Sequence, residues 1–186
     1  EEGEEPGAAV RLDPRGGDAV QVAHGTERFV AGGTAGRAWW GPLTAQWSYH
    51  QRKQQLPTGV FGRTFDDPRT SYLDERLAGE VRFERQFGRV ELFARAHANH
   101  YRFEGRHQLP FPDPALVERY YGTWFGLETR ARIRVVDQLQ VTIGAEGQHH
   151  PVATLEGSEV GQDDVPLPNG SYLAEEHPYT LGAVYG

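Results

Sequence analysis

The sequence predicts an all-β fold, an antiparallel meander of long strands, from two observations. Apolar and polar residues alternate with a period of two in several stretches, the clearest of which runs from Thr123 to Val135. Such alternation gives a strand one apolar face and one polar face. The links between these stretches are alternately very short and long, and a very short link permits only an antiparallel hairpin.

About seven strands are expected from this alternation. They lie at about 26–39, 43–54, 73–87, 89–105, 120–136, 138–156 and 177–186. Tight turns are expected at Gly41-Pro42, Gly88-Arg89 and Val136-Asp137, and long loops near 55–72, 106–119 and 157–176. Residues 1–25 are rich in Gly and charge and predict a loop or a partial hairpin, so the sheet occupies 26–186.

Composition excludes several classes of protein. The chain of 186 residues has no Cys, which excludes disulfides and thiolate sites, and its net charge of -7 argues against nucleic-acid binding. The mean hydropathy is -0.63, and no apolar run approaches the roughly 18 residues of a membrane helix. A β-barrel is the one membrane architecture that this composition permits, because only alternate residues need to be apolar.

Strand length and aromatic residues both favour such a barrel. A strand of about 12 residues tilted by about 45° rises about 28 Å, close to the thickness of the hydrocarbon layer. Aromatic rings flank the short turns at Trp39, Trp40 and Phe87. They flank the long loops at Tyr49, Tyr72, Tyr101, Phe103, Tyr120, Tyr121 and Trp124. Two such girdles are typical of transmembrane barrels, so we expect a partial, open segment of an outer-membrane β-barrel.

Several motifs resemble those of one family, the TonB-dependent outer-membrane receptors. The stretch from Leu56 to Thr70, followed by Asp74-Glu75-Arg76, resembles a long extracellular loop of a subgroup of these receptors and the strand that follows it. The segments 100–105, 121–128 and 144–146 are similar to later strands of the family, in the same order. The resemblance covers roughly residues 25–186.

The resemblance implies a large barrel that takes up a scarce ligand, such as a metal chelate, at the cell surface. A plug domain closes the lumen in this family, and TonB supplies energy from the inner membrane. The chain has no Met, no apolar N-terminal stretch, no TonB-box and no plug, so we expect it to be an internal piece of a longer protein. Its partners would then be outer-membrane lipid, TonB and the plug.

Basic residues on polar strand faces are the candidate lumen contacts for a ligand or a plug. These residues are Arg82, Arg95, His97, Arg130, Arg132 and Arg134. One interpretation is a basic patch that guides an anionic ligand. The simpler interpretation is that these cations pair with Glu80, Glu84, Glu128 and Glu146, or with a plug, and hold the wall together. The extracellular-loop candidates are Pro57, Thr58, Phe61, Gly62, Phe65, Asp67 and Arg69.

No motif predicts an enzyme, a cofactor or a metal centre. His149 and His150 are adjacent, so in a strand they face opposite ways, and His97 and His100 differ in parity as well. We therefore expect active uptake through an outer-membrane barrel. Two alternatives remain: a passive porin or other outer-membrane channel, and a soluble ligand-binding β-barrel whose apolar faces point inward.

Overall fold

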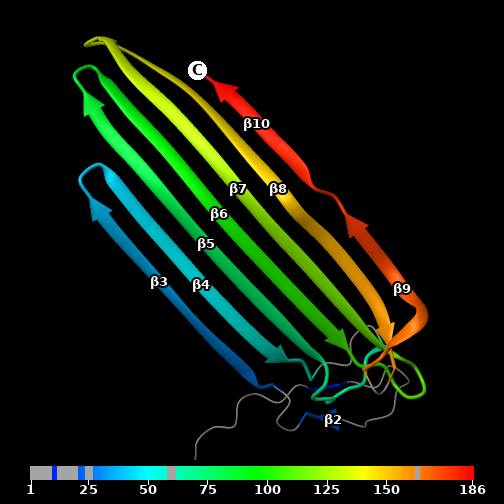
Figure 1. The fold of residues 1–186 in the computed structure, drawn as a ribbon. Helices are drawn as coiled ribbons and strands as arrows, with labels where there is room; N and C mark the ends of the chain where they lie inside the picture. The colour runs from blue at the N-terminus through cyan, green and yellow to red at the C-terminus, as the bar shows by residue number, and fades with distance from the viewer. Residues whose placement is uncertain (1–9, 12–20, 24–26, 58–61, 162–163) are drawn as a thin grey trace, which may run out of the picture.

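The computed structural model describes residues 10–11, 21–23, 27–57, 62–161 and 164–186. Its main body is one antiparallel sheet of eight strands in a single layer (Figure 1). The strands are β3 (Phe29–Trp40), β4 (Leu43–Gln55), β5 (Ser71–Phe87), β6 (Val90–His107), β7 (Ala115–Val136), β8 (Leu139–Val160), β9 (Pro166–Glu176) and β10 (Tyr179–Tyr185). Strands β3 to β8 follow one another in chain order, which confirms the predicted antiparallel meander in an open sheet.

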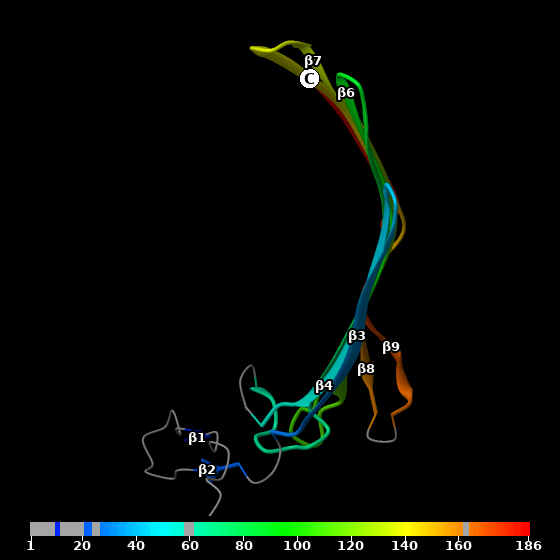
Figure 2. The ribbon, with the colours of Figure 1, turned by 90° about the vertical axis from the view of Figure 1, so that its left-hand side faces the viewer.

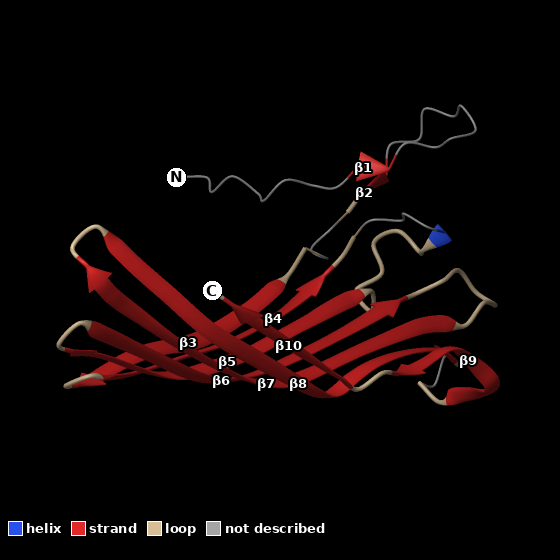
Figure 3. Cartoon of the chain, turned by 90° about the horizontal axis from the view of Figure 1, so that it is seen from above, coloured by secondary structure: helices blue, strands red, loops and turns tan. Residues whose placement is uncertain are grey.

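Outside the sheet, a separate two-stranded ladder joins β1 (Val10–Arg11) to β2 (Gln21–Val22). These strands lie in the part of the chain where a loop or partial hairpin was expected. The one helical feature of the described residues is a single turn at Gly62, seen in Figure 3. No helix in the described part of the chain is long and apolar enough to cross a membrane.

The predicted strand boundaries were wrong in two regions. Strand β7 begins at Ala115, inside the segment 106–119 that was expected to be a long loop. The segment 157–176 was expected to be a long loop, but β8 continues to Val160, and β9 turns back to pair with it. Pro166 and Pro168 argue for a loop because proline has no N–H to donate to a ladder. An edge strand tolerates proline, because one side of it has no partner strand. The third tight turn also falls one residue later than expected, at Asp137-Gln138.

Strands β9 and β10 share the same edge of β8 and are separated by His177 and Pro178. The break lies opposite a register shift in β8, where Thr123 pairs with Val152 but Phe125 pairs with His149. Strand β8 therefore has one extra residue here, and Pro151 lies within the bulge. A bulge accommodates a proline inside a sheet because the extra residue needs no ladder hydrogen bond.

Two short turns depend on glycine. Gly41 and Gly88 are each the first residue of a two-residue hairpin loop, with φ of 57° and 58°. A positive φ at this position is strained for residues with a side chain, and glycine adopts it without steric cost. The sequence thus sets the tight links β3–β4 and β5–β6.

The cross-strand register sorts the side chains onto two faces. One face carries an apolar band on the short-turn half of the sheet. This band consists of Leu43, Ala45, Trp47, Leu77, Gly79, Val81, Phe83, Leu92, Ala94, Ala96, Ala98, Phe125, Leu127, Thr129, Ala131, Ile133, Val141, Ile143, Ala145 and Gly147. Nearer the long loops the same face turns polar, with Lys53, Glu75, Arg102, Glu104, Arg119 and Glu156.

The apolar band lies on the convex face of the sheet. In β4 the N–H of Gln55 donates to Arg28 O, so Gln55 and the odd-numbered residues of β4 point their backbone groups at β3. Consider a strand of L-residues viewed with its N-to-C direction pointing up. A residue whose backbone N–H and C=O point to the right then has its side chain directed toward the viewer. In Figure 1, β3 lies to the right of the direction in which β4 travels, so the band faces the reader. Figure 2 shows that the sheet bulges toward that same side.

Buried apolar residues are few in the described part of the chain: Ala23, Phe93, Ala115, Val117 and Val160. Three of them, Ala115, Val117 and Val160, form one small cluster at the long-loop end of the sheet. Apolar side chains of the band are exposed instead, among them Leu127 at 69%. An apolar surface of this extent is unusual for a free monomer and marks a surface that another phase or molecule covers.

Candidate functional site on the concave face

A chain of ion pairs crosses the concave face on the short-turn half of the sheet. Arg82 Nε lies 2.7 Å from Glu80 Oε1, and Arg95 bridges Glu80 at 3.8 Å and Glu128 at 3.1 Å. Arg95 is the direct cross-strand partner of Arg82 and of Glu128, and Glu80 lies two residues before Arg82 on the same face of β5. The ion pairs therefore link β5, β6 and β7 across one face.

Neutral groups extend this network to the strands on either side. Arg82 donates to Gln46 Oε1 at 3.2 Å, which reaches β4. The Tyr185 hydroxyl donates to Glu128 Oε1 at 3.3 Å, which reaches β10. The polar side chains of this face thus bond mainly to one another, across five strands.

Three further arginines of the predicted set follow one another on β7. Arg132 bonds to both Glu91 carboxylate oxygens at 3.2 Å, and Arg130 lies 4.7 Å from the centre of the Phe93 ring. Arg134 pairs in register with Gln140 at the exposed end of the strand. Arg130 and Arg132 therefore contact Phe93 and Glu91 of β6, which are not among the partners expected for them.

His97 belongs to the same face and is held in place by its neighbours. Its Nδ1 lies 2.9 Å from the Asn99 amide nitrogen. A side chain at Gly126, the cross-strand partner of His97, would overlap the imidazole. The ring therefore occupies the space above Gly126. His100 has the opposite parity and bonds to Thr123 at 2.9 Å on the convex face.

The predicted loop residues form part of a folded cap at the long-loop end. The Arg69 guanidinium makes two bonds to Asp67, at 3.0 and 2.7 Å, and this contact holds the pKa of the Asp67 carboxyl below its usual range. Pro57 is buried, Phe65 is half-buried, and Gly62 has a φ of 76°. Thr58 and Phe61 lie outside the described residues.

Sequence reasoning missed the contact that joins the loops 56–70 and 108–114. Thr70 is fully buried, and its hydroxyl accepts a hydrogen bond from Gln108 N at 3.2 Å. Thr64 N donates to Gln108 O at 2.8 Å in the same region. Two polar residues buried between two distant loops give no signal in a linear pattern.

Two rows of contacting aromatic rings on the concave face were also not predicted from the sequence. Phe103 stacks on Tyr120 and touches Tyr72, each with 5.3 Å between ring centres. Closer to the middle of the sheet, His150 lies between Trp124, at 5.7 Å, and Tyr179, at 4.1 Å. Tyr72, Phe103, Tyr120 and Trp124 were assigned to a girdle and Tyr179 was not, and the cross-strand order of these rings follows only from the register.

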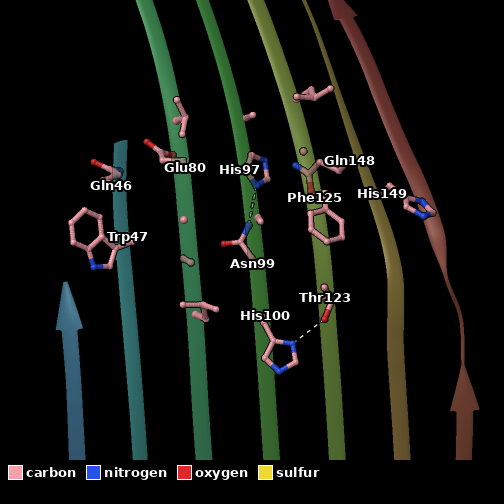
Figure 4. Close-up of a pocket in the computed structure, with 18 of the residues that line it drawn as sticks. Gln46, Trp47, Glu80, His97, Asn99, His100, Thr123, Phe125, Gln148 and His149 are labelled. Carbon is pink, nitrogen blue, oxygen red and sulfur yellow. Dashed lines mark hydrogen bonds between the residues drawn. The ribbon is translucent and has the colours of Figure 1, made fainter. Parts of the chain in front are cut away.

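A shallow hollow of about 1080 Å³ lies over the middle of the sheet. Figure 4 shows that its labelled residues come from β4 to β8. Its floor includes small residues of the apolar band, Ala45, Gly79, Ala96, Ala98 and Gly147. The polar atoms that border it are paired, as in the 2.9 Å contact of His100 with Thr123 and the 3.0 Å contact of His149 with Thr180.

Within the described residues, no group of three or more His, Asp or Glu side chains is arranged to hold a metal ion. The chain matches no protein-family model, no curated protein and no solved structure. The sheet has two unlike faces, one apolar and convex, and one charged, internally paired and concave.

Proposed function

We propose that this chain is part of the wall of an outer-membrane β-barrel that takes up a scarce ligand in a TonB-dependent manner. The observation that carries the proposal is the placement of the apolar band on the convex face. A transmembrane barrel turns its apolar residues outward to lipid and its polar residues inward to the lumen. A soluble barrel does the reverse, because its core is the apolar interior.

The dimensions of the band support the same proposal. On β5 the apolar residues of this face extend from Leu77 to Phe87, a stretch of 11 residues that is interrupted by one charged residue, Arg85. At about 3.3 Å per residue and a tilt of about 45–50° this stretch rises about 22 Å, near the roughly 25 Å apolar belt of such barrels. Trp40 and Phe87 lie at its short-turn border, and Tyr49 and Tyr121 lie at its long-loop border on the same face.

The stagger of the hairpins supports the tilt. Leu43 is the first residue of β4, and β5 continues past its partner by four residues, Glu84–Phe87. Val90 is the first residue of β6, and β7 continues past its partner by three residues, Arg134–Val136. Each hairpin thus reaches three to four residues farther than the one before, over two strand spacings. If the turns share one level, this offset corresponds to a tilt of about 50°, slightly steeper than the 35–45° usual in barrels.

The open edges are consistent with a segment of a larger barrel. Among the strands that the structure describes, β3 has no partner on its outer side, and neither do β9 and β10. Long unpaired edges are an aggregation hazard in water and do not occur in the hydrocarbon layer. Further strands on both sides would remove them.

A passive outer-membrane channel shares all of these features. Active uptake is favoured by the resemblance of the loop 56–70 and of the strands that follow it to TonB-dependent receptors. The concave network, in which arginines and carboxylates already pair, also differs from a patch of free positive charge that would attract anions into an open pore.

Cysteine accessibility tests the orientation of the wall. Single cysteines at Val81, Val141 and Thr142 are placed in the full-length protein in intact outer membranes, since this chain contains no native Cys. The cysteines at 81 and 141 should react with a lipid-soluble thiol reagent and resist a charged one, and the cysteine at 142 should show the opposite preference. Ready labelling of positions 81 and 141 by the charged reagent would refute the membrane assignment.

A further inference from the structure

Two histidines lie on the convex face, where the apolar band ends toward the long loops. His100 is the next residue of this face after Ala98 of β6, and His149 is the next after Gly147 of β8. On a surface that meets hydrocarbon, polar side chains are rare, because a polar group without a hydrogen-bond partner is costly there. The two imidazoles therefore need an explanation that the apolar band does not supply.

The two histidines lie equally far from the short turns. His100 is ten residues beyond Val90, where β6 begins, and His149 is ten residues beyond Leu139, where β8 begins. At about 3.3 Å per residue and a tilt of about 45–50°, ten residues rise about 22 Å, near the far edge of an apolar belt of roughly 25 Å. If the turns share one level, both imidazoles lie where hydrocarbon gives way to the polar part of the lipids.

Each imidazole binds a threonine of the neighbouring strand through one nitrogen. Nδ1 of His100 lies 2.9 Å from Thr123 Oγ1, and Nδ1 of His149 lies 3.0 Å from Thr180 Oγ1. No hydrogen bond within the described residues uses either Nε2. When the threonine hydroxyl donates to Nδ1, the proton of the neutral ring is on Nε2, which then has a hydrogen bond to donate.

The hollow of about 1080 Å³ begins at these imidazoles and extends toward the short turns (Figure 4). Its floor on this side is made of Ala96, Ala98 and Gly147, which precede the two histidines on the same strands. The Phe125 ring stands on β7, between the strands that carry the histidines. Each imidazole is therefore followed, in the direction of the bilayer centre, by a shallow apolar path.

We propose that this hollow binds acyl chains of ester lipids from the leaflet on the long-loop side, and that Nε2 of each histidine donates to an ester carbonyl. An ester carbonyl accepts hydrogen bonds and donates none, so it fits a donor. It also joins the polar part of a lipid to its hydrocarbon chain, as the imidazole joins the polar end of the face to the hollow. The inference rests on the proposed function, because it requires the convex face to meet lipid.

The test removes the carbonyl from the lipid and the donor from the protein. Full-length protein is refolded into vesicles of dioleoyl phosphatidylcholine, and into vesicles of the diether lipid with the same headgroup and chains but no ester carbonyl. The wild type should unfold at a higher urea concentration in the diester lipid. The double variant His100→Phe and His149→Phe keeps two rings without the donors, so the difference between the two lipids should shrink.

His150→Phe is the matched control for His149→Phe. It makes the same exchange one residue away, on the concave face, where the His150 ring stacks on Tyr179 at 4.1 Å. It should leave the difference between the two lipids as large as in the wild type. An equal loss in His149→Phe and His150→Phe would overturn the lipid site, and so would a double variant that keeps the full difference.

Cysteine labelling at position 81 in the same vesicles separates this inference from the proposed function. If the charged reagent labels position 81 readily, the convex face does not meet lipid, and both the proposed function and the lipid site fail. If position 81 is shielded and the double variant keeps the full difference between the lipids, the orientation of the wall stands and the lipid site alone is overturned.

Discussion

Leu127 and Glu128 are consecutive residues of β7 with opposite surroundings. Leu127 is 69% exposed on the convex face, and Glu128 bonds to Arg95 at 3.1 Å on the concave face. A one-residue shift in register would exchange these environments along the whole strand, so the two residues together fix which face is apolar and which is charged. Substitutions in adjacent positions can therefore separate the two faces.

We expect Ile143→Arg to destabilise the protein by about 2–4 kcal/mol in lipid, the usual penalty for a basic residue on the lipid side near the bilayer midplane. Thr142→Arg, one residue away on the concave face, should cost much less. Both are compared in the full-length protein refolded into vesicles, by the urea concentration at the unfolding midpoint. Equal costs at the two positions would contradict the outward orientation of the apolar band.

The ion pair of Arg95 and Glu128 should contribute modestly. The two side chains are 33% and 16% exposed, so water screens part of their attraction. A double-mutant cycle with Arg95→Gln and Glu128→Gln should give a coupling free energy of about 0.5–1 kcal/mol that shrinks as salt is added. A coupling near zero at low salt would show that the network does not stabilise the wall.

Much of the fold follows from the alternation of residue types. The stretch from Thr123 to Val135 specifies a strand and its two faces, and the short links at Gly41 and Gly88 specify hairpins. Strand β9 was missed because Pro166 and Pro168 mark it as a loop, and only its place at the sheet edge makes them acceptable.

The side-chain contacts between strands are harder to predict from the sequence, because they depend on the register. Trp47 covers Gly36, His97 covers Gly126, and Tyr185 covers Gly144, in each case from the neighbouring strand. A ring that lies over a cross-strand glycine shields the backbone that the missing side chain would expose. Neither residue of such a pair signals the other in the sequence, because the pairing appears only when strand order and register are known.

The pair of Gly157 and Tyr172 tests this device. A side chain at Gly157 would overlap the Tyr172 ring, so Gly157→Ala should displace the ring and cost about 1–3 kcal/mol of stability. Its matched control is Gly147→Ala, where the new Cβ would lie 3.8 Å from Leu181 O, an ordinary contact. Thermal unfolding of the full-length variants should separate them, and protease cleavage in β9 should be faster only in Gly157→Ala. Identical behaviour of the two variants would exclude a special role for the covered glycine.

His107 should make the long-loop cap sensitive to mild acid. Burial of the imidazole, with the charge of Arg63 beside it, lowers its pKa below the ordinary value of 6.5, although Glu118 opposes the shift. Below about pH 6.5 the unfolded chain therefore takes up the proton before the folded chain does. Stability should fall as the pH drops from about 6.5 toward the lowered folded pKa, and it should level off below that. The unfolding temperature of the full-length protein across this range measures the effect. His107→Gln cannot be protonated, so it should lack this part of the slope, and an unchanged slope in that variant would assign the acid sensitivity to another group.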